Sequence, residues 1–367
     1  MAKSCHAQAK PKRLQQRTSM QPLGRLASLC ALLLASCNMN NGALDVLRHI
    51  GHIERLDPAL EDLVPSSTQI EVIAEGFAWS EGPVWIPEDG GYVLFSDIPP
   101  NQTMKWQRGV GTSVYLQQSG YLGPIPRPNH TAPDEPGANG LLLDHEGRLV
   151  LCQHGERQVG RMDATLSAPK AKFIALAKSY AGKRLNSPND ATFHKNGDLY
   201  FTDPPYGLTR KMEDPNKDLP FQGVYRATPD GTVTLLTKSM SRPNGIAFSP
   251  DHKTLYVANS DPKRAIWMAF PVKPDGTLGT GRVLFDATPM VGTRKGLPDG
   301  LKIDLHGNLF ATGPGGVLVL TPDGKHLGTL MTGEATSNCA FGEDGSTLFV
   351  TADSLLLRIE LATSANR

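Results

Sequence analysis

The sequence of 367 residues predicts an all-β fold, a six-bladed β-propeller with a metal site in its central channel. Three observations predict this fold. One hairpin pattern occurs six times, successive copies begin about 40–60 residues apart, and each copy begins with Asn, Asp or Glu at the same position. A period of about 40–50 residues with four strands per unit is typical of propellers.

The clearest copy of the pattern lies in residues 182–208. The polar entry Asn186-Ser-Pro-Asn-Asp190 leads into an alternating strand, Asn196-Gly197 turns the chain, and residues 198–202 return. Asn-Gly between two alternating runs is a strong hairpin signal. Because the entry and exit of a hairpin lie at the same end, we expect Asn189 and Asp190 close to Asp203.

The first residue of each copy is here called its anchor, and the anchors are Glu81, Asn139, Asn189, Asn244, Asp299 and Asn338. All six hold one equivalent position, at the start of the innermost strand of a blade. Equivalent positions in a propeller face the axis, so the anchors are expected to converge on the central channel.

The N-terminal residues 1–37 are interpreted as a lipoprotein-type signal peptide. They contain six basic residues and no acid, followed by an apolar run of about 11 residues that is too short to span a bilayer. Leu34-Ala-Ser-Cys37 resembles the bacterial lipobox, which predicts a lipid anchor at Cys37 and an exported protein of the periplasm or cell envelope. An ordinary cleaved signal with an incidental cysteine is the alternative.

Residues 38–66 are interpreted as a tether with a short helix over 44–63, and residues 67–367 as the propeller. The last copy of the pattern contains only two or three strands. An alternating segment, Thr68 to Ile73, is therefore expected to complete the last blade and close the ring, which removes free sheet edges.

Composition excludes several classes of function. Without residues 1–37 the chain has 31 basic and 36 acidic residues, a formal charge of about −5, and it has no basic patch for nucleic acid. No later apolar run could span a membrane, so a membrane is contacted only through the lipid anchor. Cys152 and Cys339 fall in inner strands of different blades; buried free thiols and a disulfide both stay open.

The anchors indicate a site for a divalent metal. Glu81, Asn189, Asn244 and Asp299 are two carboxylates and two carboxamides, all oxygen ligands of the kind that Ca²⁺ prefers. Zn²⁺ favours His or Cys, which no anchor provides, although Zn²⁺, Mg²⁺ and Mn²⁺ stay open as alternatives. The competing interpretation is that Asn-Gly and Asp-Gly only form turns. Turn formation explains Asn139 and Asn338 well and explains Glu81 poorly.

Three long loops enter the end of the channel where the anchors lie. They are residues 121–137, which are rich in proline, 205–220 and 288–298. Loops of this length in a compact fold are often lids or binding loops, and simple surface connectors are the alternative.

Several motifs carry a family resemblance. They are Glu81-Gly-Pro-Val-Trp85, the run 182–190, Phe201-Thr-Asp-Pro-Pro-Tyr-Gly207, the run 242–250 and Leu297-Pro-Asp-Gly300. Together they resemble the gluconolactonase/regucalcin (senescence marker protein) family of six-bladed propellers over residues 68–361. The segment Cys152-Gln-His-Gly-Glu156 adds similarity to the bacterial gluconolactonase branch.

The resemblance implies roles for individual residues. Glu81, Asn244 and Asp299 match the three metal ligands shared across the family. Asn189 matches the fourth, a direct ligand in related phosphotriesterase-type propellers and a substrate contact in regucalcin. Regucalcin holds the sugar with an arginine two residues before that asparagine, where this sequence has Ser187. Residues that could replace that arginine are Arg184, Arg242 and Arg294, and the sequence positions none of them.

The expected activity is metal-dependent hydrolysis of a small-molecule sugar lactone, with ring opening to the aldonic acid by metal-activated water. Asp299 is the expected base, with its pKa lowered by the cation. No Gly-x-Ser-x-Gly elbow and no His-x-x-x-His pair occurs, so a covalent serine mechanism is disfavoured. The candidate substrate-binding residues are Asn139, His154, Asn189, Asp203 and Arg184.

Alternatives remain for two residues and for the function itself. His154 either binds substrate and relays protons or is bonded to a neighbouring carbonyl. Asp203 either meets substrate or holds the adjacent loop in place. The same metal site could cleave another lactone or a phosphotriester, and a propeller with a purely structural metal could be a non-enzymatic binding scaffold. The natural lactone and the oligomeric state are left open by the sequence.

Overall fold

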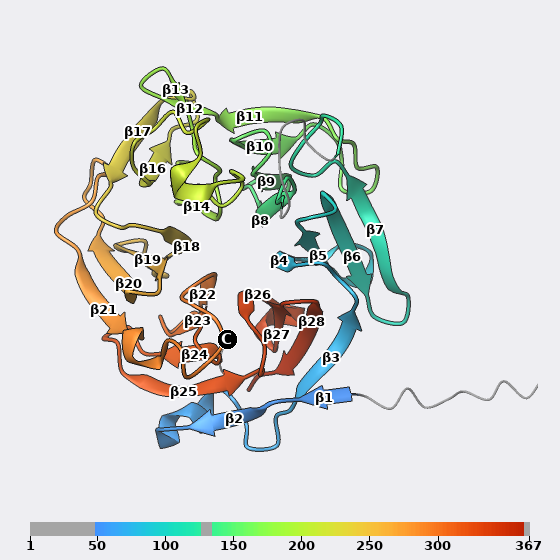
Figure 1. Ribbon diagram of the computed structural model, residues 1–367. Coiled ribbons are helices and arrows are strands. Elements are labelled where there is room, and N and C mark those ends of the chain that lie inside the picture. The colour runs from blue at the N-terminus through green and yellow to red at the C-terminus, as the bar shows by residue number, and fades with distance from the viewer. Residues whose placement is uncertain (1–47, 126–133, 363–367) are drawn as a thin grey trace, which may run out of the picture. The chain divides into compact units, whose positions relative to one another are not determined.

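Six antiparallel sheets surround a central axis in the computed structural model, which describes residues 48–125 and 134–362 (Figure 1). The predicted six-bladed propeller is confirmed. One strand of each sheet lies nearest the axis, and these strands are β4, β8, β14, β18, β22 and β26, whose bounds follow. Each is paired with the next strand in the chain, as the six predicted hairpins require.

Blades one to four consist of four consecutive strands each. Blade one contains β4 (Ser80–Ile86), β5 (Tyr92–Asp97), β6 (Gln102–Gln107) and β7 (Gly111–Gln117). Blade two contains β8 (Ala138–Leu143), β9 (Leu149–Gln153), β10 (Gln158–Met162) and β11 (Phe173–Ala177). Blade three contains β14 (Ala191–Phe193), β15 (Leu199–Asp203), β16 (Gly223–Ala227) and β17 (Val233–Thr237). Blade four contains β18 (Pro243–Phe248), β19 (Thr254–Asp261), β20 (Arg264–Pro271) and β21 (Arg282–Asp286).

Blades five and six each have five strands, because the N-terminal segment adds to both. Blade five contains β22 (Leu301–Ile303), β23 (Leu309–Gly313), β24 (Gly316–Leu320), β25 (His326–Met331) and, outermost, β2 (His52–Arg55). Blade six contains β26 (Thr336–Gly342), β27 (Thr347–Ala352), β28 (Leu355–Glu360), β3 (Ile70–Glu75) and, outermost, β1 (Arg48–Ile50). The pairing of β3 with β28 closes the ring, as predicted for this segment.

The short helix expected over 44–63 is wrong. Residues 48–55 form β1 and β2, and only Pro58–Asp62 forms a single 3₁₀ turn, η1. Two open sheet edges explain the difference, because β1 pairs with β3 and β2 pairs with β25. This pairing satisfies the backbone groups at both edges, whereas a short helix would leave its terminal backbone groups without partners. The part of the expected tether that the structure describes is thus built into the propeller, and the described residues belong to one compact unit.

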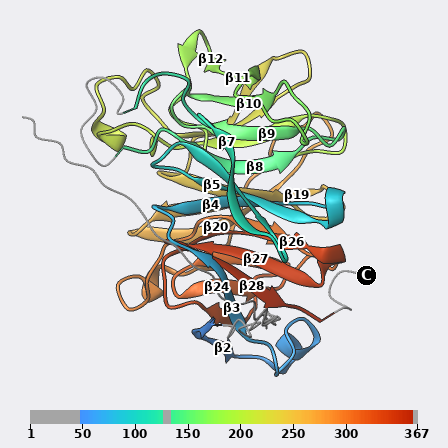
Figure 2. The same cartoon turned by 90° about the vertical axis from the view of Figure 1, so that its right-hand side faces the viewer.

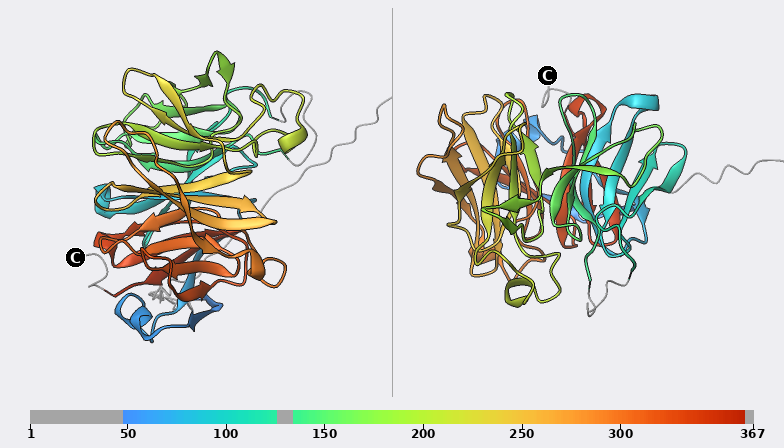
Figure 3. Two further views of the ribbon diagram at one scale, coloured as in Figure 1. Left: turned by 90° about the vertical axis from the view of Figure 1, so that its left-hand side faces the viewer. Right: turned by 90° about the horizontal axis from the view of Figure 1, so that it is seen from above.

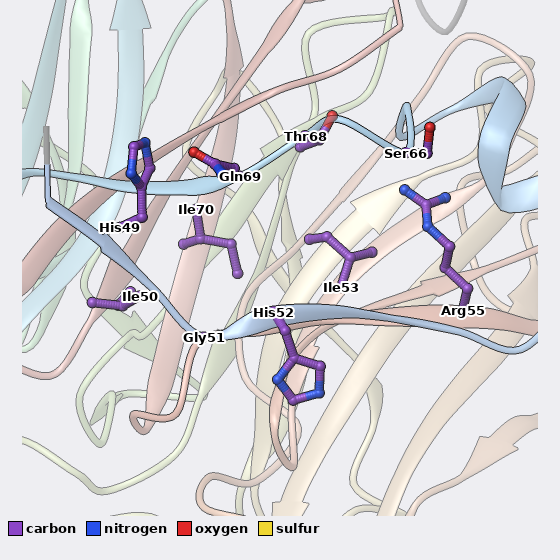
Figure 4. Close-up of a pocket in the computed structure, with 10 residues that line it drawn as sticks. All are labelled: His49, Ile50, Gly51, His52, Ile53, Arg55, Ser66, Thr68, Gln69 and Ile70. Atoms are coloured by element: carbon purple, nitrogen blue, oxygen red, sulfur yellow. The ribbon is translucent and has the colours of Figure 1, made fainter.

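The segment that links the two blades turns at Gly51 (Figure 4). Its φ is +61°, and a β-carbon there would lie 1.7 Å from the carbonyl oxygen of Met331, so only glycine fits. A pocket of about 340 Å³ lies between this segment and residues 66–70. Figure 4 shows His49 and His52 pointing to opposite sides of the segment, so the two imidazoles do not converge on one point.

Short helical turns and one small hairpin complete the structure. The 3₁₀ turns are η2 (Glu88–Gly90), η3 (Lys211–Glu213), η4 (Thr288–Met290) and η5 (Glu343–Gly345), and the hairpin is β12 (Ser179–Tyr180) with β13 (Lys183–Arg184). Figures 2 and 3 show the segment around η3 at one end of the ring and the hairpin turn that holds η2 at the other. The loop that carries η3 therefore lies at one end of the ring, and the turn between β4 and β5, which holds η2, lies at the opposite end.

Apolar side chains fill the spaces between neighbouring blades rather than the axis. Cys152 packs with Val150 and Phe201 between blades two and three, and Cys339 packs with Phe310 and Val350 between blades five and six. Both cysteines are buried and free, which decides between the two interpretations that the sequence left open. Among the described residues no helix is long and apolar enough to cross a membrane. Residues 1–37, for which a signal peptide is predicted, and the predicted anchor Cys37 lie outside the described residues.

Candidate functional site

The anchors lie where the inner strands depart from regular pairing. In β4 the register shifts between Glu81 and Val84, and β8 and β18 shift at their equivalent positions. In blades three and five the inner strand begins only after the anchor, at Ala191 and Leu301. Irregular pairing of this kind changes the direction of side chains relative to the regular alternation of a strand. Here it occurs at the first residues of the inner strands, where the anchors lie.

Glycine after the anchor lets neighbouring inner strands approach closely. A β-carbon on Gly245 would lie 2.2 Å from the carbonyl oxygen of Asp299, closer than any real contact. The same crowding recurs around the ring, and the glycines concerned are Gly82, Gly140, Gly245 and Gly300. The Asn-Gly and Asp-Gly pairs are thus not turns, the competing interpretation of the sequence. They permit close approach between neighbouring inner strands at four places around the channel.

A cavity of about 190 Å³ opens at the anchor end of the channel. All four predicted ligands line it, together with Asn139, so the structure brings together five of the predicted site residues. The complete lining is Trp79, Glu81, Ile98, Glu135, Asn139, Asn189, Tyr206, Arg242, Asn244, Ser260, Leu297 and Asp299. Each of the three long loops contributes one of these residues: Glu135, Tyr206 and Leu297.

Three oxygen atoms from described residues that line this cavity lack hydrogen-bond donors, whereas Glu81 accepts from the backbone N–H of Gly82 at 2.6 Å. Within the described residues, the Oδ1 atoms of Asn139, Asn189 and Asp299 are buried and accept no hydrogen bond. Asn139, Asn189, Asn244 and Glu81 are all at most 4% exposed, whereas Asp299 is half-buried, so four of the five oxygen-bearing side chains are removed from water together. Buried acceptors without donors are rare, because each costs free energy unless a partner is present.

The residues fit a hard divalent cation. Carboxylate and carboxamide oxygens with no protein donor are the ligands that Ca²⁺ takes, usually six to eight in number. No group of three or more His, Cys, Asp or Glu side chains within the described ranges could hold a metal by itself. The set that fits is mixed, since two of its four side chains, Asn189 and Asn244, are carboxamides.

Carboxylates crowd one another in the channel. Burial raises the pKa of Glu81 to about 7, and the Asp190 carboxylate adds to the rise. Burial also raises the pKa of Asp299 well above its usual range, with the charges of Glu81 and Asp190 contributing. Without a cation, the pKa of Asp299 is therefore raised, whereas the expectation from the sequence is that a bound cation lowers it. A bound cation would favour the ionised form of both carboxylates.

Two residues of this cluster were not predicted as site residues. Asp190 stands where blades one, two, four and five have the glycine after the anchor, and its Oδ2 is buried and accepts no hydrogen bond from the described residues. Lys302 donates to the carbonyl oxygen of Leu301 (3.2 Å) and to Asn338 Oδ1 (3.3 Å), and its charge lowers the pKa of Asp190. The break in the glycine pattern was a usable signal for Asp190, whereas nothing in the sequence marked Lys302.

Three predicted residues do not line the cavity. His154 is fully buried, and its Cβ lies 2.5 Å from the point that a β-carbon on Gly207 would occupy. Asp203 is also fully buried, and its Oδ2 accepts from the backbone N–H of Asn186 at 2.8 Å. Arg184 is exposed on the β12–β13 hairpin. Asp203 thus holds the loop that leads to Asn189, which was the alternative role considered for it.

The arrangement matches a known family of proteins. The family model described as SMP-30/Gluconolactonase/LRE-like region matches residues 79–354. The chain belongs to the SMP-30/gluconolactonase/LRE-like family. A gluconolactonase of Zymomonas mobilis is 40% identical over 342 residues, which is 92% of each chain. A regucalcin of Xenopus laevis is 25% identical over 293 residues, 78% of this chain and 87% of that one.

Solved structures show the same architecture. A gluconolactonase from Xanthomonas campestris is 31% identical, with a TM-score of 0.72 over 86% of this chain and 96% of that one. A calcium-binding regucalcin from Agrobacterium tumefaciens is 23% identical, with a TM-score of 0.60 over 81% and 94%. The second likeness supports the fold, and the first extends to the sequence.

Proposed function

We propose that this protein is a lactonase that hydrolyses a sugar lactone to the aldonic acid with the help of a divalent cation. The observation that carries the proposal is the cavity at the anchor end of the channel, where the donor-free oxygens of Asn189 and Asp299 meet Glu81 and Asn244. The 40% identity to a gluconolactonase over nearly the whole chain supports the class of substrate.

Glu81, Asn189, Asn244 and Asp299 would hold the cation. When bound, a divalent cation supplies Lewis-acid stabilisation of negative charge on the lactone carbonyl oxygen. Ca²⁺ fits this ligand set best, because all four side chains offer hard oxygen atoms.

Asp299 is the proposed base. Its carboxylate takes a proton from a water molecule as the water oxygen forms a bond to the lactone carbonyl carbon. The bond between that carbon and the ring oxygen then breaks, and the proton passes to the ring oxygen, which leaves as a hydroxyl. Tyr206 and Leu297, supplied by two of the long loops, narrow the cavity around the reacting groups.

The proposal is tested by hydrolysis of glucono-δ-lactone with the purified protein, with and without a chelator. Spontaneous ring opening is subtracted using a blank without protein. We expect activity that the chelator abolishes and that added Ca²⁺ restores. Mg²⁺, Mn²⁺ and Zn²⁺ are added in parallel to identify the ion.

Absence of activity while the protein still binds Ca²⁺ would contradict the sugar lactone as substrate. A panel of aliphatic and aromatic lactones and a phosphotriester would then separate another hydrolase from a non-enzymatic binding protein. Activity that survives the chelator would contradict the role of the cation.

We also propose that the protein is exported and lipid-anchored at Cys37. The lipobox-like Leu34-Ala-Ser-Cys37 supports this proposal. Labelling of cells with a radioactive fatty acid tests it: the full chain should incorporate label, and a Cys37→Ser variant should not. Equal labelling of both would contradict the anchor.

A further inference from the structure

The arginine position that the family resemblance assigns to sugar binding is closed in this chain. Ser187 stands there, two residues before the anchor Asn189, and it is fully buried. Its Oγ donates to the carbonyl oxygen of Pro204 at 2.6 Å and accepts from the backbone N–H of Gly207 at 2.9 Å. Both interactions are within the protein, so Ser187 fixes the loop and offers nothing to a substrate.

Two of the three arginines that could replace it lie elsewhere. Arg294 makes a double ion pair with Glu54, each nitrogen 2.9 Å from a carboxylate oxygen, and does not line the cavity. Arg184 is exposed on a hairpin and is also absent from the cavity wall.

Arg242 is the arginine that lines the cavity. It stands two residues before the anchor Asn244, which is the same spacing one blade further around the ring. Its backbone is fixed on both sides, because its N–H donates to Asn259 Oδ1 at 2.9 Å and its carbonyl accepts from the N–H of Ser260 at 2.8 Å. The main chain therefore presents this side chain in one place.

The guanidinium of Arg242 is available to a ligand. The residue is half-buried, and within the described residues its side chain makes no hydrogen bond or ion pair. The Asp261 carboxylate accepts from the Ser241 hydroxyl instead, which lowers the pKa of Asp261, and the charge of Arg242 adds to this lowering. A guanidinium carries five N–H donors and no acceptor, so it needs oxygen partners. Arg242 lines the same cavity as Asp299, and its positive charge acts on the Tyr206 hydroxyl, so the guanidinium belongs to the cavity that contains the proposed base.

We propose that Arg242 binds the ring hydroxyl oxygens of the substrate and makes the site selective for polyhydroxylated lactones. This inference rests on the proposed lactonase function and adds the residue that reads the sugar. The resemblance implies a sugar-binding arginine two residues before the anchor of blade three. In this chain the arginine stands at the equivalent position in blade four.

The test compares two substrates that share the lactone ring and differ in hydroxyl groups, glucono-δ-lactone and δ-valerolactone. In Arg242→Met we expect kcat/KM for gluconolactone to fall about 10- to 100-fold, the loss typical of a charged hydrogen bond. For δ-valerolactone we expect less than a threefold change. For gluconolactone, kcat/KM of Arg242→Lys should lie between the values of Arg242→Met and the wild type, because lysine keeps the charge but lacks the planar guanidinium.

Arg282→Met is the matched control, since Arg282 is an exposed arginine on the outermost strand of the same blade. Arg282→Met should leave kcat/KM unchanged for both substrates. Thermal unfolding of each variant checks that it folds. An equal loss on both substrates, or no loss on either, would overturn the role of Arg242. A wild-type protein that hydrolyses only δ-valerolactone would instead refute the proposed sugar lactone, and the Arg242 assignment with it.

Discussion

Gly245 and Asp299 belong to neighbouring blades, and the carbonyl oxygen of Asp299 lies 2.2 Å from the point that a β-carbon on residue 245 would occupy. The backbone of Asp299, the proposed base, can take this position only because residue 245 in the neighbouring blade is a glycine. The side chain of Asn244, which precedes this glycine, also favours the ionised form of Asp299, against the larger effect of burial, which raises the pKa of that carboxyl. The contact between the two inner strands thus sets the geometry of the cavity.

Gly245→Ala is expected to push the two inner strands apart. Overpacking of this kind costs about 1–3 kcal/mol, which would lower the thermal midpoint by several degrees. The variant should also lose activity at temperatures where it is still folded, because the added methyl group displaces the backbone of Asp299 and with it the carboxylate. The control is Gly279→Ala in the same blade, where the nearest atom would lie at an ordinary 3.4 Å. Equal behaviour of the two variants would show that the close approach is unimportant.

Asp299→Asn is expected to remove most of the turnover while the fold persists. A carboxamide of the same shape keeps an oxygen for the cation but cannot accept the proton, so kcat should fall about 10²- to 10⁴-fold. Calorimetry should still detect Ca²⁺ binding, with reduced affinity, and the thermal midpoint should not drop. Full activity of this variant would remove Asp299 as the base.

Lys302→Met is expected to tighten divalent-ion binding and to destabilise the metal-free protein. Lys302 lowers the pKa of Asp190 and of Glu81, so its charge offsets part of the repulsion among the channel carboxylates. Without it, the affinity for Ca²⁺ should rise on the order of tenfold. Titration calorimetry measures the affinity, and Lys170→Met, at an exposed site, is the control. Weaker binding in Lys302→Met would contradict this account.

Asp203→Asn is expected to flatten the dependence of stability on pH. Burial raises the pKa of Asp203 to about 7, whereas the pKa in the unfolded chain is about 4. The native state thus binds more protons between these values, so stability falls as pH rises through about 7. Asparagine keeps an acceptor for the Asn186 N–H and does not ionise. The difference in thermal midpoint between pH 5 and pH 8 should therefore be smaller in the variant.

Comparing the same two proteins at both pH values cancels the contributions of the other buried carboxylates. Parallel curves for wild type and variant would show that Asp203 stays in one protonation state over this range.

Much of the fold and the site could be predicted from the sequence because the information is local. Each hairpin carries its own alternation and turn residues, and six similar units with anchors in one register can only meet at an axis. The cavity that contains Glu81, Asn189, Asn244 and Asp299 follows from that register. The roles of these residues as ligands and base stay predictions that the experiments above address.

The tertiary structure alone decided the questions that depend on which segments meet. Residues 48–55 became strands because two open sheet edges were within reach, an advantage that no local pattern encodes. Arg242, Arg184 and Arg294 have the same chemistry, and closure of the ring placed the first in the cavity, the second on the surface and the third against Glu54. The sequence determined the repeating unit and its polar anchors, whereas the neighbours of each side chain were set by distances between blades, which exist only once the ring is closed.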